Sequence, residues 1–140
     1  MEILLVEDNY SDIFLFKMFL EDIERSVKLR VIRDGASVTG YLVNTAIKEN
    51  HNLPDLIVLD LNLPNENGFE ILSEIKSNPL LRDLNVLIFT TSAEIEDKLY
   101  AMKLGAMNFL TKPCDINEFE KAMQIIYYSV FNDNRRIMQQ

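Results

Sequence analysis

Charged and polar side chains stand directly after several short, mostly apolar runs of the sequence. Glu7 and Asp8 follow the run ILLV, and Asp60 follows LIVL. Thr90 follows VLIF, and Lys112 follows MNFLT. An ionised carboxylate at the end of a buried strand loses hydration, so it stays charged only where a cation or several donors replace that water. The pattern indicates either a set of turn residues or one polar site.

These residue types suit phosphoryl chemistry on a carboxylate. Three acidic groups close together repel one another, and oxygen ligands without His or Cys favour Mg²⁺ over zinc. We therefore expect Glu7, Asp8 and Asp60 to share a Mg²⁺ ion. A carboxylate can attack phosphorus, which makes Asp60 a candidate nucleophile. Lys112 would add a fixed positive charge and Thr90 a neutral donor for the phosphoryl oxygens.

Taken one at a time, each of these residues is more often structural. A lone Asp after an apolar strand is usually a turn or cap residue, and a Glu-Asp pair before a helix usually interacts with the helix dipole. Thr90 alone suits a turn, and Lys112 alone suits a solvated surface. Their placement after successive strands of one sheet favours a site.

The elements that position these residues form an alternating α/β pattern. The runs Ile3–Val6, Leu56–Leu59 and Val86–Phe89 are continuously apolar, which indicates strands buried on both faces. Val27–Ile32 alternates apolar and basic residues, as a half-exposed strand does, and Met107–Leu110 is a last short strand. Helices are expected at 11–24, 36–49, 68–77, 93–104 and 115–131. The pattern predicts a doubly wound parallel sheet, whose ligands bind at the carboxyl ends of the strands.

Bulk composition bounds the class of protein. The chain has 140 residues, 48% hydrophobic and 26% charged, which suits one globular domain. Its net charge of −8 disfavours nucleic-acid binding through overall charge. The single cysteine, Cys114, fits a reducing compartment, and the N-terminal apolar run is too short for a signal peptide or membrane span. A cytoplasmic protein is expected.

With these residues in order, the chain resembles the receiver domain of two-component response regulators over about residues 2–131. The matching residues are the pair Glu7-Asp8, Asp60, Gly68, Thr90 and the triplet Thr111-Lys112-Pro113. The resemblance implies a flavodoxin-like fold, with five parallel strands in the order 2-1-3-4-5 and helices on both faces. It implies a receiver domain at 1–131, followed by a polar tail at 132–140 and no output domain.

The resemblance also implies a role for each acidic residue. Asp60 would be the phosphoacceptor. Asp8 and Asp60 would bind Mg²⁺ directly, the backbone carbonyl of Asn62 would complete the protein ligands, and Glu7 would act mostly through water.

Other residues would bind the phosphoryl group and respond to it. Lys112 would pair with that group, and Thr90 would move toward it, so that the ring of Phe109 could turn inward. Many members have Tyr where this chain has Phe109, and a smaller residue where it has Thr91. Thr91 would narrow access to the site, and Pro113 would lie beside it.

A narrower resemblance concerns the partner. The motifs RDG at 33–35, DLNLP at 60–64 and TTS at 90–92 are similar to those of single-domain receivers that partner bacterial phytochrome-type histidine kinases. The phosphoryl donor would then be a sensor histidine kinase of that type. Output would go through protein contact or onward phosphotransfer to a downstream protein, without direct nucleic-acid or membrane binding.

The expected output surface is formed by the fourth helix, fifth strand and fifth helix. Leu99, Met102, Met123 and Tyr127 are the candidates to dock a partner or a second copy of the chain. The spacing of Phe119, Met123 and Ile126 also suits a core face, and Tyr127 has packing inward as its alternative. Two residues are predicted to play no part in chemistry. His51 is expected to be solvated, and Cys114 to be an inert packing residue.

Two other functions fit part of the pattern. A haloacid-dehalogenase-type phosphatase also uses an Asp nucleophile, but it carries an acidic residue two positions later, where this chain has Asn62. It also needs cap insertions for which the chain has no room. The second is a binding-only receiver that takes no phosphate, and the complete set of Asp8, Asp60, Thr90 and Lys112 disfavours it. The leading function is a phosphorylation-controlled interaction module that turns over no metabolite.

Overall fold

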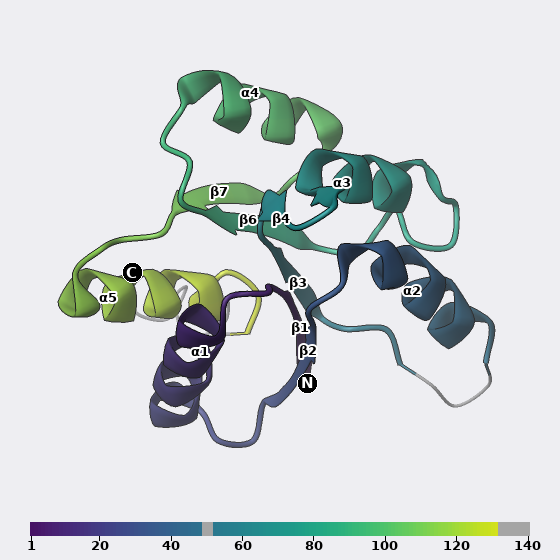
Figure 1. The fold of residues 1–140 in the computed structure, drawn as a ribbon. Helices are drawn as coiled ribbons and strands as arrows, with labels where there is room; N and C mark the ends of the chain where they lie inside the picture. The colour runs from purple at the N-terminus through teal and green to yellow at the C-terminus, as the bar shows by residue number, and fades with distance from the viewer. Residues whose placement is uncertain (49–51, 132–140) are drawn as a thin grey trace, which may run out of the picture.

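A computed structural model of the chain describes residues 1–48 and 52–131. Its centre is a sheet of five parallel strands (Figure 1), which are β1 (Glu2–Val6), β2 (Lys28–Ile32), β3 (Leu56–Leu59), β6 (Val86–Thr90) and β7 (Asn108–Thr111). The strands lie in the order β2-β1-β3-β6-β7. When two short strands outside this sheet are not counted, that order is the predicted 2-1-3-4-5, so the fold prediction is confirmed.

Five helices cover the two faces of the sheet. They are α1 (Tyr10–Ile23), α2 (Val38–Ile47), α3 (Gly68–Ser77), α4 (Ile95–Leu104) and α5 (Ile116–Tyr128), with a short 3₁₀ turn η1 (Gly35–Ser37) before α2. Figure 1 shows α1 and α5 on one face and α2, α3 and α4 on the other. Each helix lies within two or three residues of its predicted bounds, and Gly105 ends α4 in the left-handed conformation with φ 109°.

The buried core consists of two apolar clusters, one on each face of the sheet. Strand residues alternate between them, because successive side chains point to opposite faces. Leu4, Val6, Ile57 and Leu59 pack toward α2, α3 and α4. Ile3, Leu5, Leu56 and Val58 pack toward α1 and α5. This two-sided burial explains the continuously apolar runs, whereas β2, at the sheet edge, alternates half-buried and exposed residues.

A small hairpin between β3 and α3 was not predicted. Its strands are β4 (Asn62–Leu63) and β5 (Glu66–Asn67), which pair antiparallel. Asn65 has φ 61° in the two-residue turn formed by Pro64 and Asn65, a conformation that Asn tolerates well. The hairpin was missed because two-residue strands carry no periodic signal. It brings Asn67 to the N-terminus of α3, where the Asn67 side chain accepts a hydrogen bond from the Phe69 amide at 2.8 Å.

One prediction about an individual side chain is wrong, because Cys114 is exposed and so is not a packing residue. Met123 and Tyr127 are buried in the cluster beneath α5, so of their two expected placements the structure has the core and not the output surface. His51, the tail at 132–140 and the end of the predicted helix 36–49 lie outside the described residues.

Across residues 1–48 and 52–131, we find no helix with both the length and the apolar character needed to cross a bilayer.

Candidate functional site

The predicted site residues meet at the carboxyl edge of the sheet. Glu7 directly follows β1, Asp60 directly follows β3, Thr90 ends β6 and Lys112 directly follows β7. Their exposed fractions are 2%, 6%, 0% and 8%. In the described part of the chain, these four are the only buried polar or charged residues. The sequence prediction that they form one cluster is therefore confirmed geometrically.

Lys112 is the centre of the cluster. Its Nζ donates to Glu7 Oε1, to Asp12 Oδ2 at 2.9 Å and to Asp60 Oδ2 at 3.1 Å. Sequence reasoning missed Asp12, which lies in the first turn of α1 with 27% of its side chain exposed. An acidic residue in a first helical turn usually interacts with the helix dipole, so its sequence context gave no sign of a buried lysine nearby.

The cluster holds more negative than positive charge. Burial alone would lower the pKa of Lys112, but hydrogen bonds to Glu7 and Asp12 and the charge of Asp60 outweigh it and raise that pKa above its usual value. Burial raises the pKa of Glu7 to about 7, opposed by the hydrogen bond from Lys112 and reinforced by the charge of Asp60. Both pKa values are raised, but for different main reasons: acidic neighbours outweigh burial at Lys112, whereas burial is the main cause at Glu7.

Glu7 also organises the loop that leads into α1. Its second oxygen, Oε2, accepts hydrogen bonds from the amides of Asp8 at 3.1 Å and Asn9 at 3.3 Å. Asn9 caps α1 through its own side chain, which accepts from the Asp12 amide at 3.0 Å. Glu7 therefore fixes the backbone on which the next acidic residue, Asp8, stands.

The acidic residues can hold a divalent cation. One carboxylate oxygen from each of Glu7, Asp8 and Asp60 lies within 4.8 Å of the others. All three donors are hard oxygens, which is the donor set that Mg²⁺ and Mn²⁺ accept. A shallow hollow of about 500 Å³ is lined by Asp8 and Asn62.

Asn62 links the acidic group to the two threonines. Its backbone amide donates to Asp60 Oδ1 at 3.2 Å. Its side-chain amide lies 3.4 Å from the Thr90 hydroxyl and 3.5 Å from the Thr91 hydroxyl. Thr91 is exposed at the rim, as expected for a residue that limits access. Both oxygens of Asp60 are thus held by donors, one by Asn62 and the other by Lys112.

Gly68 is required by the close approach of the chain that carries Asp60. A Cβ at Gly68 would lie 2.5 Å from the carbonyl oxygen of Asp60 and 2.6 Å from the Cα of Leu61. The Gly68 amide also donates to the Leu61 carbonyl at 3.0 Å. The helix α3 can start at this point because its first residue has no side chain.

Phe109 already lies inward in this structure. The residue is 6% exposed and packs in the cluster with Ala101 and Ala106. From this arrangement a further inward rotation would remove little apolar surface from water, so the switch role of Phe109 stays a prediction. The neighbouring strands are joined next to the site, where the Lys112 amide donates to the Thr90 carbonyl at 2.6 Å. Pro113 follows, half-buried, as predicted for a residue beside the site.

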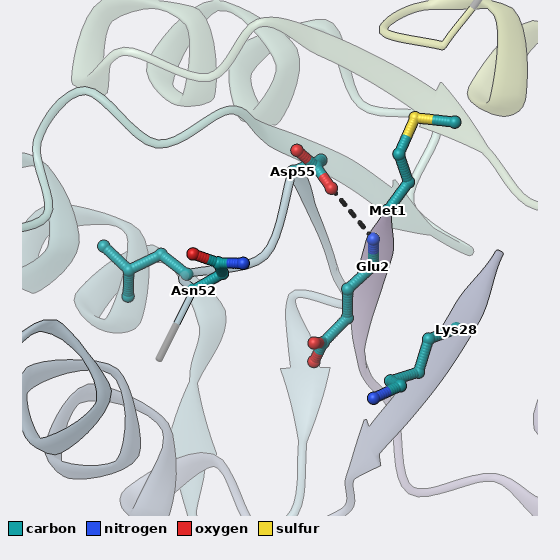
Figure 2. A pocket seen from close by; sticks show the side chains of 6 residues that line it. Met1, Glu2, Lys28, Asn52 and Asp55 are labelled. Atoms are coloured by element: carbon teal, nitrogen blue, oxygen red, sulfur yellow. Dashed lines mark hydrogen bonds between the residues drawn. The ribbon is translucent and has the colours of Figure 1, made fainter. Parts of the chain in front are cut away.

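A second cavity lies at the opposite, amino end of the strands. Figure 2 shows Glu2, Lys28 and Asp55 around it, with the Glu2 amide donating to Asp55 Oδ2 at 2.8 Å. Its volume is about 460 Å³. Among the residues that the structure describes, this end has no buried lysine and no group of converging carboxylates, so the candidate site is the carboxyl edge.

Comparison with known proteins agrees with this geometry. Residues 3–124 match the family model of the response regulator receiver domain. The chain is 37% identical over 122 residues to Response regulator Rcp1 of Synechocystis sp., covering 87% of this chain and 83% of that protein.

Solved structures of similar proteins have the same fold. The Mn²⁺-bound form of response regulator Rcp1 matches with a TM-score of 0.81 at 36% identity, over 91% of both chains. The phosphorylated cyanobacterial phytochrome response regulator RcpA matches with a TM-score of 0.82 at 34% identity, also over 91% of both chains. The bacteriophytochrome response regulator AtBRR matches with a TM-score of 0.71 at 36% identity, over 93% of both. The chain therefore belongs to the response regulator receiver domain family of two-component systems.

Proposed function

We propose that this protein takes a phosphoryl group from a histidine kinase onto Asp60, with Mg²⁺ bound by Asp8, Asp60 and the Asn62 carbonyl. The observation that carries the proposal is the environment of Asp60. Its carboxylate is buried after β3, bonded to Lys112 at 3.1 Å, and grouped with the carboxylates of Glu7 and Asp8. A buried group with excess carboxylates destabilises a fold, and such groups occur mainly at functional sites. Phosphoryl transfer is a function that needs these residues.

The chemistry follows from these contacts. A carboxylate oxygen of Asp60 forms a bond to phosphorus as the bond between phosphorus and the donor's histidine nitrogen breaks. Asn62 and Lys112 hold the two oxygens of Asp60 and so fix the direction of attack. A divalent cation held by the acidic group would supply positive charge that offsets the charge of the phosphoryl oxygens.

Lys112 and Thr90 would bind the product. An acyl phosphate adds acceptor oxygens, so Lys112 can exchange one carboxylate for a phosphoryl oxygen while keeping its charge paired. The Thr90 hydroxyl, now near the Asn62 amide, is a second donor at the same edge. We expect Thr90 to move toward the phosphoryl group and to pull the β6–α4 connection with it.

Two of the relatives support a proposal for the partner kinase. RcpA and AtBRR are a phytochrome and a bacteriophytochrome response regulator, which supports a phytochrome-type histidine kinase as the donor. The output surface would lie on α4, β7 and α5, and would bind a downstream protein or a second copy of the chain. It would use the exposed apolar side chains Ile95, Leu99, Tyr100, Met102, Ile116 and Ile125. The cytoplasmic location stays a prediction.

The receiver function has two alternatives, a phosphatase and a binding-only receiver. Membership of the receiver family favours a receiver over a haloacid-dehalogenase-type phosphatase. A binding-only receiver would keep the fold and never become labelled. That the protein turns over no metabolite stays a prediction.

Incubation with acetyl phosphate and Mg²⁺, followed by intact-protein mass measurement, tests the proposal. We expect one added phosphoryl group in the wild type, none in Asp60→Asn and none when the cation is chelated. Asp55→Asn, at the other end of the sheet, is the matched control and should be labelled as the wild type is. An unlabelled wild type supports the binding-only alternative, and equal labelling of Asp60→Asn overturns the assignment of Asp60.

The kinase is tested separately. An autophosphorylated phytochrome-type histidine kinase should transfer its phosphoryl group to the chain faster than a histidine kinase of another class does. Equal transfer rates from the two kinases would contradict a phytochrome-type partner but not the receiver function.

A further inference from the structure

We infer that Arg33 is a positioning residue for Asp8, and that through Asp8 it sets the affinity of the site for a divalent cation. The inference rests on the proposed function, since it takes Asp8 as a cation ligand. Arg33 follows β2, at the edge of the sheet, and does not itself belong to the acidic group.

Arg33 ties the loop after β2 to the loop after β1. Its Nη2 donates to the backbone carbonyl of Asp8 at 3.0 Å, and its Nη1 donates to the hydroxyl of Tyr10. The guanidinium carbon also lies 3.8 Å from the centroid of the Tyr10 ring. Tyr10 is the first residue of α1 and is exposed, and the planar guanidinium stacks on the face of its ring.

The backbone of Asp8 is therefore held from both sides. Its amide donates to Glu7 Oε2 at 3.1 Å, and its carbonyl accepts from Arg33 at 3.0 Å. Within residues 1–48 and 52–131, we find no hydrogen bond to the Asp8 carboxylate. Asp60, by contrast, has donors on both carboxylate oxygens.

The backbone of Asp8 sets the direction of its Cα–Cβ bond, and with it the region that the carboxylate can reach. A shift of that backbone therefore moves the carboxylate relative to those of Glu7 and Asp60. The hydrogen bonds of Glu7 and Arg33 hold this backbone in place. Partners behind the ligands of a metal typically change its affinity about 10- to 100-fold when they are removed. Because Arg33 is exposed, we expect a smaller effect, about three- to tenfold.

The charge of Arg33 acts in the opposite direction. A guanidinium near an acidic site repels an incoming cation, so a purely electrostatic role predicts tighter cation binding when Arg33 is removed. A positioning role predicts weaker binding. The sign of the change therefore separates the two roles.

Arg30, which lies in β2 three residues before Arg33, supplies a matched control. Its Nε pairs with Glu2 Oε1 at 3.1 Å, and its guanidinium carbon lies 5.4 Å from the centroid of the Tyr41 ring. These contacts resemble those of Arg33 but lie away from the acidic group. Arg30→Ala removes an exposed arginine, an ion pair and an aromatic contact without touching the loop that carries Asp8.

Calorimetric titration with Mg²⁺ of the wild type, Arg33→Ala, Arg33→Lys, Arg30→Ala and Asp8→Asn tests the inference. We expect Arg33→Ala to bind Mg²⁺ about three- to tenfold more weakly and Arg30→Ala to bind as the wild type does. Arg33→Lys keeps the charge, but one ammonium cannot reproduce the planar fork, so part of the loss should remain. At saturating Mg²⁺ the labelling rate of Arg33→Ala by acetyl phosphate should return to the wild-type rate.

Hydrogen exchange in the metal-free protein gives a readout that does not depend on the cation. The amides of Asp8 and Asn9 should exchange faster in Arg33→Ala than in the wild type or Arg30→Ala. The urea unfolding midpoints of the three proteins should be the same, so that the faster exchange reports this loop alone. If the wild type and Asp8→Asn bind Mg²⁺ equally, the proposed cation site fails. If Asp8→Asn loses affinity while Arg33→Ala binds as tightly as the wild type or more tightly, only the role of Arg33 is overturned.

Discussion

The two ends of the sheet use similar residues in different ways. At the amino end, Arg30 pairs with Glu2 at 3.1 Å, and their side chains are 49% and 19% exposed. At the carboxyl end, Lys112 pairs with Glu7 and Asp60, and these three side chains are 5%, 3% and 8% exposed. The first pair is exposed to solvent and joins one arginine to one carboxylate. The second group is buried and places several carboxylates around one lysine.

This difference separates a surface interaction from a site. An exposed ion pair contributes about 0–1 kcal/mol, and water and salt screen whatever remains. Buried carboxylates in excess cost stability, and the raised pKa of Glu7, at about 7, reflects their burial and mutual repulsion. The carboxyl end is therefore the place where the fold keeps a charge imbalance that a cation can relieve.

The largest effect on stability should come from filling the space at Gly68. Gly68→Ala would place its Cβ 2.5 Å from the Asp60 carbonyl oxygen, which is backbone and cannot swing aside. We expect a loss of about 1–3 kcal/mol in the free energy of unfolding, measured in urea, together with weaker Mg²⁺ binding.

Gly40→Ala is the matched control. Gly40 lies within α2, and a Cβ there meets no atom within 4 Å. This change should stabilise the protein by up to about 1 kcal/mol, since alanine favours a helix over glycine. Equal effects of the two substitutions would show that close packing against Asp60 is not what requires Gly68.

Removing one acidic charge from each end should change stability in opposite directions. Without cation, Asp8→Asn should raise the free energy of unfolding by about 1 kcal/mol, because it removes a charge that repels Glu7 and Asp60. Asp55→Asn should lower it by about 0.5 kcal/mol, because an amide oxygen accepts the Glu2 amide less strongly than a carboxylate does.

Mg²⁺ should reverse the effect at the carboxyl end. At 100 times its dissociation constant, the cation adds about 2.7 kcal/mol to the wild type and little to Asp8→Asn. Urea unfolding with and without Mg²⁺ measures both values. A metal-free Asp8→Asn less stable than the wild type would contradict the charge imbalance.

The smallest expected effect is the release of protons when the cation binds. Because the pKa of Glu7 is raised to about 7, this carboxyl group is partly protonated near neutral pH. A bound cation favours the ionised form, so binding should release a fraction of one proton near pH 7, and affinity should fall as pH drops below that value. Calorimetry in two buffers of different ionisation enthalpy counts the protons. Affinity that is unchanged between pH 6 and 8 would show that Glu7 is already ionised.

The sequence predicted best where a charge interrupts an apolar run. Asp60 and Lys112 follow continuous or nearly continuous apolar strands. Parallel strands place their carboxyl ends at one edge of the sheet for any conformation of the connecting loops. Asp12 could not be found in the same way, because it sits in a helix first turn where acidic residues are common. Its contact with Lys112 depends on how α1 packs beside the sheet.

Side-chain orientation was harder to predict than position. Met123 and Tyr127 were expected either in the core or on an output face, and only the packing of α5 decides for the core. Phe109 was expected to turn inward when Thr90 moves, but it already packs in the cluster that contains Ala101 of α4. Arg33 appeared only within the motif RDG at 33–35, since the local sequence does not show a hydrogen bond to the backbone of a distant loop.

The most direct test of the central claim is to identify the phosphorylated residue. The protein is labelled with acetyl phosphate and Mg²⁺, then reduced with borohydride, which converts an aspartyl phosphate to homoserine and releases phosphate. Peptide mass mapping should find homoserine at position 60, and should find aspartate unchanged at Asp8, Asp12 and Asp55. Homoserine at another position, or none in a protein whose intact mass has risen by one phosphoryl group, would contradict the assignment of Asp60 as the phosphoacceptor.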